Sequence, residues 1–534
     1  MSKLKDINRR ELLQFLGLTG ANAMLSPLNL LTQSLISGAV TKAYAGEVNL
    51  NPRRLLYISL PGGPARWTFD FFLNPYGSAG FTPNTHTVMK YTEVAGRYID
   101  AEYKTVSVKG IEAPWQWQFN VPTADGGSRP MSDLLNNLLA LQGLNSGSDS
   151  HDISRMNILT PLGALQSLTA MPADASNAPI KAASAEVQDL VFRSSKGFSN
   201  VPISNFNSVS NSFNLLQTLM DPFTSKTGAA FNDKKAQLKS YLDASTASLT
   251  AYAQREHPGA SILAADQKSA TELLGKALGD MNTYWTNAVA KYESLIMRAL
   301  DRSNPLPGLT DLPVGTEGTR NNFYRYNLDG AMATAADLRD LIPATGKFGN
   351  LARHMALAEY LFVNKLTHSL SIGPGMMATP DEHGTGKMVS LITNTYNWRA
   401  YAACLLELIT QLKAANVFQD TVIAMLSEFN RTPRNDGFGS DHGSTAASGV
   451  FYSGAIQGPM ILGRMQANSN PTRSKDGYSS SGSIGRGDGN RDYASMMSSA
   501  AALIRVPSPI TAKFSMVSEL NGVIVANSEK STLY

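Results

Sequence analysis

The 534-residue chain contains a single cysteine, Cys404, and only seven histidines. A lone cysteine can form no disulfide within the chain and cannot build a cysteine-cluster metal site. A metal ion in this protein would therefore be bound by oxygen and imidazole groups. Two of the few histidines belong to short acidic segments, Asp381 with His383 and Asp441 with His442.

The chain also lacks a strong excess of charge of either sign, with 46 Lys and Arg against 42 Asp and Glu. Cleavage after Ala45 would remove five basic and two acidic residues and lower the formal net charge from +4 to +1. Nucleic acids and anionic membranes bind proteins through a concentrated positive face. We therefore expect neither as a partner.

No hydrophobic run is apolar enough for a permanent membrane anchor. The longest uncharged run, residues 12–41, contains polar and helix-breaking residues such as Gln14, Asn22, Pro27 and Asn29. Such residues are costly in the hydrocarbon core of a bilayer. We therefore predict that the mature protein carries no permanent anchor.

The amino terminus instead has the features of an export signal. Basic residues precede the uncharged run, and "AYA" at 43–45 has the small-x-small form of a signal-peptidase site. "NRRELLQFLG" resembles a twin-arginine signal through Arg9 and Arg10, although an ordinary secretory signal with adjacent arginines is the alternative. We predict a twin-arginine export signal over residues 1–45, the twin-arginine translocase as partner, and a periplasmic or secreted protein.

The mature part of the chain alternates short apolar runs with helical patterns. The run in "RRLLYISLPGG" stops at Pro61-Gly62-Gly63, as a buried strand followed by a loop would. Further strands are predicted at "RMNILTP", "KLTHSLSIG", "TVIAML", "GVFYSG" and "PMILG". Helical patterns separate several of them, including "LARHMALAEYLFV" and "YAACLLELITQLKAA". We therefore expect an α/β fold over residues 46–534, with a mostly parallel sheet covered by helices on both faces.

A helical insertion is expected from about 212 to 303. Apolar and aromatic residues recur there at helical spacing, as in Leu274, Leu278, Met281 and Trp285. Two long amphipathic helices explain this pattern. Their aromatic stripes indicate packing faces and not ligand sites.

Acidic and histidine side chains follow three of the predicted strands. Asp70 follows the first strand, the Asp381 and His383 pair follows "KLTHSLSIG", and Glu428 with Asp441 and His442 follows "TVIAML". Mixed oxygen and nitrogen donors suit divalent ions such as Zn, Mn or Mg, and a bound cation offsets the repulsion of clustered carboxylates. Spacing alone leaves open that these residues are solvated caps or salt-bridge partners.

The segment "LSEFNRTPRNDGFGSDHG" resembles the S-E-F-G-R-T-P…N…G-R-D-H signature of the DUF1501 family, exported bacterial proteins related to the alkaline phosphatase and sulfatase superfamily. "LPGGPARWTFD", "LARHMALAEYLFV" and "PDEHG" are similar to further segments of that family. The resemblance implies an alkaline phosphatase-like fold and two divalent metal ions that polarise a phosphoryl or sulfuryl oxygen.

The resemblance also implies roles for individual residues. Arg431 would either orient an anionic oxygen of the substrate or pair with Glu428, since arginine suits both tasks. Asp70 is the loosest match. The implied metal ligands are Asp70, Asp381, His383, Glu428, Asp441 and His442.

The chain departs from the family pattern at three positions. Asn430 stands where the motif has Gly, Ser440 where it has Arg, and Glu382 where it has Thr. Substrate contacts or loop geometry are therefore expected to differ. The nucleophile stands in no identifying motif. "LQGLNSGSDSHDIS" offers Ser146, Ser148 and Ser150, of which Ser150 is the predicted nucleophile, and His151 as an additional ligand or anion contact. Polar loop residues are the alternative for all three serines.

Together these features predict an exported metal-dependent hydrolase that acts on phosphate or sulfate esters. The substrate would be a small anionic ester or a polymer. The alternative is a non-catalytic periplasmic or secreted protein that uses the same fold for binding, because a fold alone does not determine a reaction.

Overall fold

The computed structural model describes several stretches of the chain and not all of it. The described residues are 51–64, 69, 72, 90–94, 97–102, 105–178, 180–187, 190–203, 284–303, 306, 342–375, 387–433, 440–443, 447–463, 465–467, 478–480, 491–510 and 515–527. The chain divides into two compact units, and apart from the last residue of β10 the described residues lie in the unit formed by Val48–Pro202 and Asp280–Tyr534. The predicted export signal lies outside the described residues.

A nine-stranded sheet forms the centre of this unit, in the order β10-β9-β11-β1-β12-β15-β8-β16, with β19 also paired to β8. Its strands are β1 (Arg54–Leu60), β8 (Leu138–Asn145), β9 (Ala183–Ala185), β10 (Val201–Ile203), β11 (Ser369–Ile372), β12 (Thr421–Ser427), β15 (Ala447–Ser453), β16 (Met460–Leu462) and β19 (Arg491–Asp492). β1 is parallel to both β11 and β12, whereas β15 is antiparallel to β12 and β8. The sheet is therefore mixed and mostly parallel.

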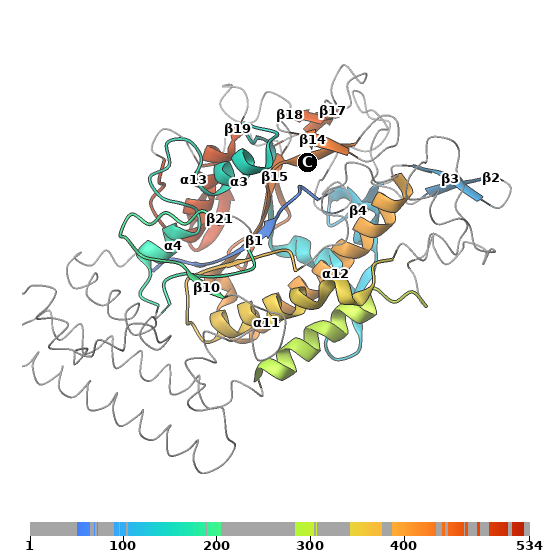
Figure 1. The fold of residues 1–534 in the computed structure, drawn as a ribbon, viewed down its shortest axis with the longest axis horizontal. Helices are drawn as coiled ribbons and strands as arrows, with labels where there is room; N and C mark the ends of the chain where they lie inside the picture. Colours follow the sequence, from blue (N-terminus) through green and yellow to red (C-terminus); the bar gives the residue numbers. More distant parts are fainter. Residues whose placement is uncertain are drawn as a thin grey trace, which may run out of the picture. The chain divides into compact units, whose positions relative to one another are not determined.

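Helices cover the sheet because its central strands have no polar face. Every residue of β12 and of β15 is buried, which requires packing on both sides of the sheet. α3 and α13 lie on one side of it, and α11 and α12 on the other (Figure 1). The described helices are α3 (His151–Leu159), α4 (Ala170–Ala175), α11 (Gly349–Val363), α12 (Lys387–Ala414), α13 (Tyr493–Ile504) and the helical residues 284–299.

The remaining described elements are short strand pairs and 3₁₀ turns. The two-stranded pairs are β2 (Lys90–Val94) with β3 (Arg97–Glu102), β4 (Thr105–Val108) with β5 (Ile111–Pro114), β6 (Asn120–Pro122) with β7 (Ser128–Pro130), β13 (Asn430–Pro433) with β14 (Ser440–Gly443), β17 (Met465–Ala467) with β18 (Tyr478–Ser480), and β20 (Val517–Leu520) with β21 (Val523–Ala526). The 3₁₀ turns are η3 (Trp115–Gln118), η4 (Met131–Asn137), η5 (Thr345–Phe348) and η6 (Phe418–Asp420).

Most of the strands and helices expected from the sequence are present. One prediction is wrong: "RMNILTP" belongs to α3 and not to a strand. Its buried residues Ser154, Ile158 and Leu159 recur at helical spacing, which a short apolar run does not reveal. The expected polar loop after β12 instead forms the β13–β14 hairpin. Of the expected helical insertion, only residues 284–303 are described, and most of these are helical.

The parallel strands bring their carboxyl ends to one edge of the sheet. β1 ends at Leu60 beside Ser427, the last residue of β12. β8 runs in the same direction as β12, because β15 lies between them and is antiparallel to both. The segments that follow β1, β8 and β12 therefore meet at this edge, where open α/β folds place their ligand sites. None of the described helices is both long and apolar enough to cross a membrane.

Candidate functional site

The turn after β1 is built for close approach to the end of β12. Gly62 and Gly63 have φ angles of 77° and 58°, a region that side chains with a Cβ rarely adopt. A Cβ at Gly63 would also lie 2.6 Å from a ring carbon of Phe429. The two glycines thus let the β1 turn pack directly on the residues that follow β12.

Arg431, in β13, holds the β1 turn against the residues that follow β12. Its guanidinium is fully buried and lies 5.6 Å from the centre of the Phe429 ring. Its Nε donates to the carbonyl oxygens of Gly62 and Gly63 at 3.0 and 2.9 Å, and Nη2 also donates to Gly62. These contacts hold the β1 turn against the β13–β14 hairpin. Contact of Arg431 with a substrate anion stays a prediction.

Glu428 is the charged centre of the site, and its side chain is only 2% exposed. Oε1 accepts hydrogen bonds from the Gly62 amide at 2.6 Å and from Arg155 Nε at 3.2 Å. Oε2 lies 2.5 Å from Nδ1 of His151. Groups from β1, α3 and β12 therefore converge on one buried carboxylate. A carboxylate at Nδ1 holds the proton on that nitrogen and leaves Nε2 as the basic position of the ring.

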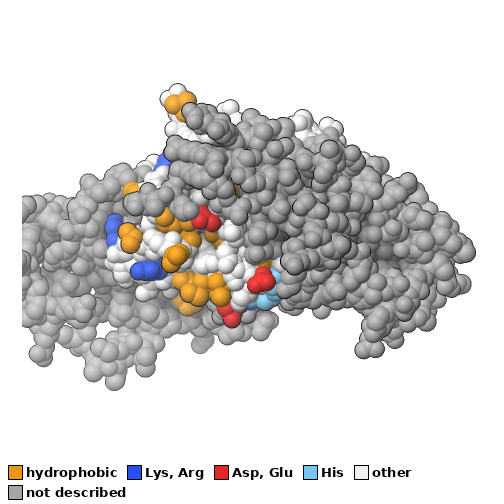
Figure 2. All heavy atoms as spheres, turned by 90° about the horizontal axis from the view of Figure 1, so that it is seen from above, with side chains coloured by type: hydrophobic (Ala, Val, Ile, Leu, Met, Phe, Trp, Pro, Cys, Tyr) orange, Lys and Arg blue, Asp and Glu red, His pale blue; other side chains and the backbone are white. Residues whose placement is uncertain are grey.

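His442 joins this group from β14. Its ring centre lies 4.5 Å from that of His151 and 4.1 Å from that of Phe429. Its Nδ1 lies 2.5 Å from the carbonyl oxygen of Asp149, in the loop before α3. In the hairpin register His442 stands opposite Arg431, so one short antiparallel pair supports both residues. On the face seen in Figure 2, histidine side chains are exposed beside acidic ones, next to a group of hydrophobic side chains.

Ser150 lies at the entrance to the same group. It is the N-cap residue of α3, follows the loop after β8, and has an exposed side chain that makes no capping hydrogen bond. The neighbouring residues Asp149 and His151 contact His442 and Glu428. A hydroxyl at a helix start after a strand matches the position expected for the nucleophile. The positive end of the α3 dipole would also favour an anion there.

Two buried tyrosines lie near Glu428. Burial raises the pKa of Tyr57 in β1 to about 12, and the negative charge of Glu428 adds to the rise. Tyr57 is therefore neutral across the physiological range. Tyr493 of α13 donates from its hydroxyl to the carbonyl oxygens of Ser427 and Glu428 at 2.9 and 3.0 Å. This bond ties the end of β12 to α13.

The predicted site residues divide into three groups. Glu428 and His442 come together around His151, which the sequence offered only as an additional ligand. Asp441 lies in β14 opposite Thr432. Asp70, Asp381 and His383 lie outside the described residues.

Sequence reasoning missed Arg155 because it read that segment as a strand. It also missed Tyr493 and the Gly62 amide, which lie far from Glu428 in sequence. The helical spacing of Ser154 and Ile158 within "HDISRMNIL" was the available signal for Arg155, although the run is short.

The donor types at this site suit a divalent metal ion, since carboxylate oxygen and imidazole nitrogen are common ligands of Zn and Mn. Within the described part of the chain, however, no group of three or more Asp, Glu, His or Cys side chains is arranged to hold an ion. Glu428 already accepts from Gly62, Arg155 and His151. In this structure Glu428 holds the ring of His151 through Nδ1, and its binding of a metal stays a prediction.

A family model matches residues 378–475. It is the model of DUF1501, described as a protein of unknown function. The match confirms the family expected from the motif around Glu428, and it includes the β13–β14 hairpin. No curated protein and no solved structure matches the chain.

Proposed function

We propose that the chain is an exported, metal-dependent hydrolase of phosphate or sulfate esters with an alkaline phosphatase-like fold. The convergence of His151, Glu428 and His442 at the carboxyl edge of parallel strands carries this proposal. Two imidazoles and a carboxylate from three separate segments form a polar group next to an exposed serine. Such a combination of possible ligands and a hydroxyl is the arrangement expected of a hydrolytic site.

The metal would be held by His442 together with Asp381, His383 and Asp441, and it would supply positive charge that polarises a phosphoryl or sulfuryl oxygen. The order of the strands supports this set. Asp381 and His383 follow β11 in sequence, and β11 is parallel to β1, so its carboxyl end lies at the same edge as those of β1 and β12. His151 completes the site, held in place by Glu428.

Ser150 would supply the attacking oxygen. Its hydroxyl is exposed at the amino end of α3, where the helix dipole stabilises the negative charge of a phosphate or sulfate group. Arg431 has a structural task here, since its buried guanidinium holds Gly62 and Gly63. The anion would therefore be bound mainly by the metal and by backbone amides at the start of α3.

The test is hydrolysis of small chromogenic phosphate and sulfate esters by the mature protein with Mn²⁺ or Zn²⁺ supplied. We expect slow but measurable turnover, abolished in Ser150→Ala, while Ser128→Ala, an exposed serine of β7, retains it. His442→Ala should lower both turnover and the metal content of protein purified without added metal. A fully metallated protein that hydrolyses no ester in a broad panel would instead indicate a binding protein.

Export by the twin-arginine route is a separate part of the proposal. It rests on Arg9, Arg10 and the "AYA" sequence at 43–45. Changing both arginines to lysine should leave uncleaved precursor in the cytoplasm. Normal export and processing of that double variant would refute the route without affecting the proposed reaction.

A further inference from the structure

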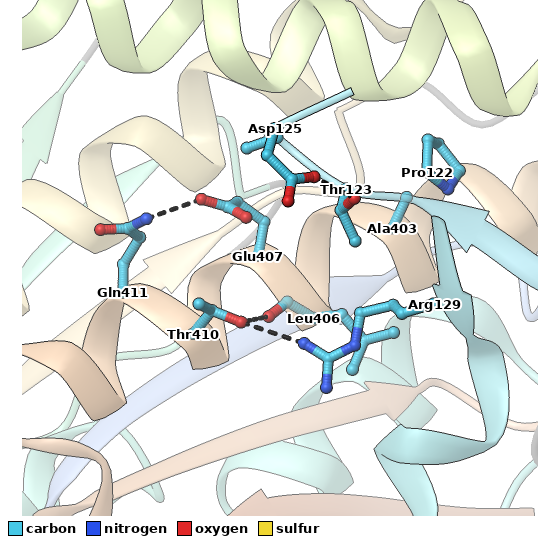
Figure 3. Close-up of a pocket in the computed structure, with 10 residues that line it drawn as sticks. Pro122, Thr123, Asp125, Arg129, Ala403, Leu406, Glu407, Thr410 and Gln411 are labelled. Atoms are coloured by element: carbon cyan, nitrogen blue, oxygen red, sulfur yellow. Dashed lines mark hydrogen bonds between the residues drawn. The ribbon is translucent and has the colours of Figure 1, made fainter. Parts of the chain in front are cut away.

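A second polar region lies between the β6–β7 hairpin and α12. It is a pocket of about 340 Å³ lined by Pro122, Thr123, Ala124, Asp125, Arg129, Ala403, Leu406, Glu407, Thr410 and Gln411. Figure 3 shows Asp125, in the turn between β6 and β7, and Glu407, on α12, among the residues that line this space. Pockets of roughly 300 Å³ or more are large enough for a small organic molecule.

Glu407 is the buried charge of this pocket, with only 7% of the residue exposed. Its Oε1 accepts from Gln411 Nε2 at 2.7 Å and lies 3.3 Å from Nζ of Lys291. Among the described residues, Oε2 has no hydrogen-bonding partner. One oxygen of a nearly buried carboxylate is thus left available on the pocket side.

The positive charge near Glu407 is shared with another buried carboxylate. Lys291 lies 2.7 Å from Oε2 of Glu359, closer than it lies to Glu407. Glu359 also accepts from the hydroxyls of Tyr284 and Tyr292, each at 2.7 Å. One ammonium therefore serves two buried carboxylates. Glu407 therefore has the weaker share of this ammonium, which leaves its carboxylate able to accept from a further donor.

The other charged residues at the pocket have partners of their own. Arg129 is paired with Asp133 at 3.0 Å, and its Nη1 donates to the hydroxyl of Thr410. Hydrogen bonds from Thr123 and from the Gly127 amide lower the pKa of Asp125, with a smaller contribution from Arg298, so Asp125 is ionised at neutral pH. Lys109 also reaches Asp133, at 3.8 Å, so the surroundings are close to neutral as a whole, whereas the acidic groups that line the pocket itself are Asp125 and Glu407.

We propose that this pocket binds a small hydroxylated amine of the size of an amino sugar, with its ammonium group between Asp125 and Glu407. An ammonium has three donors for the carboxylate oxygens, and hydroxyl groups would find partners in Thr123, Thr410 and Gln411. Leu406 and Ala403 provide an apolar wall for the ring. The pocket is larger than a bare ion needs. This inference is independent of the proposed ester hydrolysis.

Glucosamine is the probe, and glucose and N-acetylglucosamine are the uncharged controls with the same ring. We expect glucosamine to bind the full chain, measured by calorimetry and by a rise in Tm, and the two controls to bind at least about tenfold more weakly, as the loss of a charge-assisted contact implies.

The variants separate the pocket from general charge effects. Glu407→Gln and Asp125→Asn should each weaken glucosamine binding about tenfold or more, whereas Glu293→Gln, at an exposed acid of the helix 284–299, should not. Asp125 lies on the surface, so its variant tests the proposal even if Glu407→Gln fails to fold. Equal binding of glucose and glucosamine, no binding of glucosamine, or wild-type binding by both pocket variants would overturn the proposal.

Discussion

Glu428 and Glu407 are both buried glutamates on the same unit, yet their carboxylates are satisfied in different ways. Glu428 accepts from a backbone amide, from Arg155 and from His151, so both of its oxygens are used by the protein. Glu407 uses one oxygen, and the lysine beside it lies closer to Glu359. The first carboxylate holds three segments together, whereas the second retains capacity for a ligand.

The difference follows from which elements meet at each place. Glu428 stands at the carboxyl edge of the sheet, where the turn after β1 and the start of α3 both present donors. Glu407 lies in the middle of α12, where the backbone amides are already used within the helix. Only side chains can compensate its charge. A buried acid on a helix therefore depends more on neighbouring side chains, or on a ligand, than one at a strand end.

Removal of Glu428 is expected to have the largest effect. Glu428→Ala leaves the Gly62 amide and Arg155 without their buried partner and should lower the free energy of unfolding by about 3 kcal/mol. Urea denaturation measures this change, with Glu293→Ala as the control that should change stability by less than about 0.5 kcal/mol. A similar small change in both variants would mean that Glu428 does not hold the segments together.

The β1 turn offers the next test. Gly63→Ala places a Cβ within 2.6 Å of Phe429 at a φ of 58°, so it combines backbone strain with overpacking and should cost roughly 2 to 4 kcal/mol. Gly110→Ala is the matched control, because its φ is 80° and nothing lies within 4 Å. That variant should show strain alone, about 1 kcal/mol. If Gly63→Ala and Gly110→Ala lose the same amount of stability in thermal or urea denaturation, the contact with Phe429 contributes nothing to the cost.

His368 is a buried base, and it extends the comparison of the buried acids to a group of the opposite charge. Burial lowers the pKa of His368 to about 3, and the positive charges of Arg54 and Lys181 contribute. The unfolded chain, with a histidine pKa near 6.5, then binds more protons than the folded chain as the pH falls. Stability should decrease from about pH 6.5 toward pH 3, by at most about 1.4 kcal/mol per pH unit from this residue. His368→Gln should flatten the profile in urea denaturation across that range, and an unchanged slope would contradict this origin.

Glu407→Gln is expected to have the smallest effect on stability. The substitution keeps the shape of the side chain and leaves Lys291 paired with Glu359, so the free energy of unfolding should change by less than about 1 kcal/mol. Urea denaturation of Glu407→Gln and of Glu428→Ala under the same conditions compares the two carboxylates directly. A loss as large as that of Glu428→Ala would show that Glu407 is a structural charge and not a ligand group.

The elements that the sequence predicted well are those with a strong local pattern. The continuous apolar runs of β1, β12 and β15 and the helical periodicity of α11 and α12 depend only on neighbouring residues. α3 was mistaken for a strand because Arg155 to Pro161 is too short a run to distinguish the two periods. The hairpin that carries Arg431 and His442 was mistaken for a loop, since its polar residues hide the alternation of a strand.

Composition and local motifs by themselves determined that a lone Cys404 excludes disulfides within the chain, that the strands are buried on both faces, and that Glu428 and His442 belong near a strand end. Only the tertiary structure decided that Glu428 meets Gly62, 366 residues away, and that His151 stands between Glu428 and His442. It also decided that Lys291 is shared between two glutamates. The physical reason is range: periodicity and turn chemistry act over a few residues, whereas charge compensation depends on which distant segments the sheet order brings together.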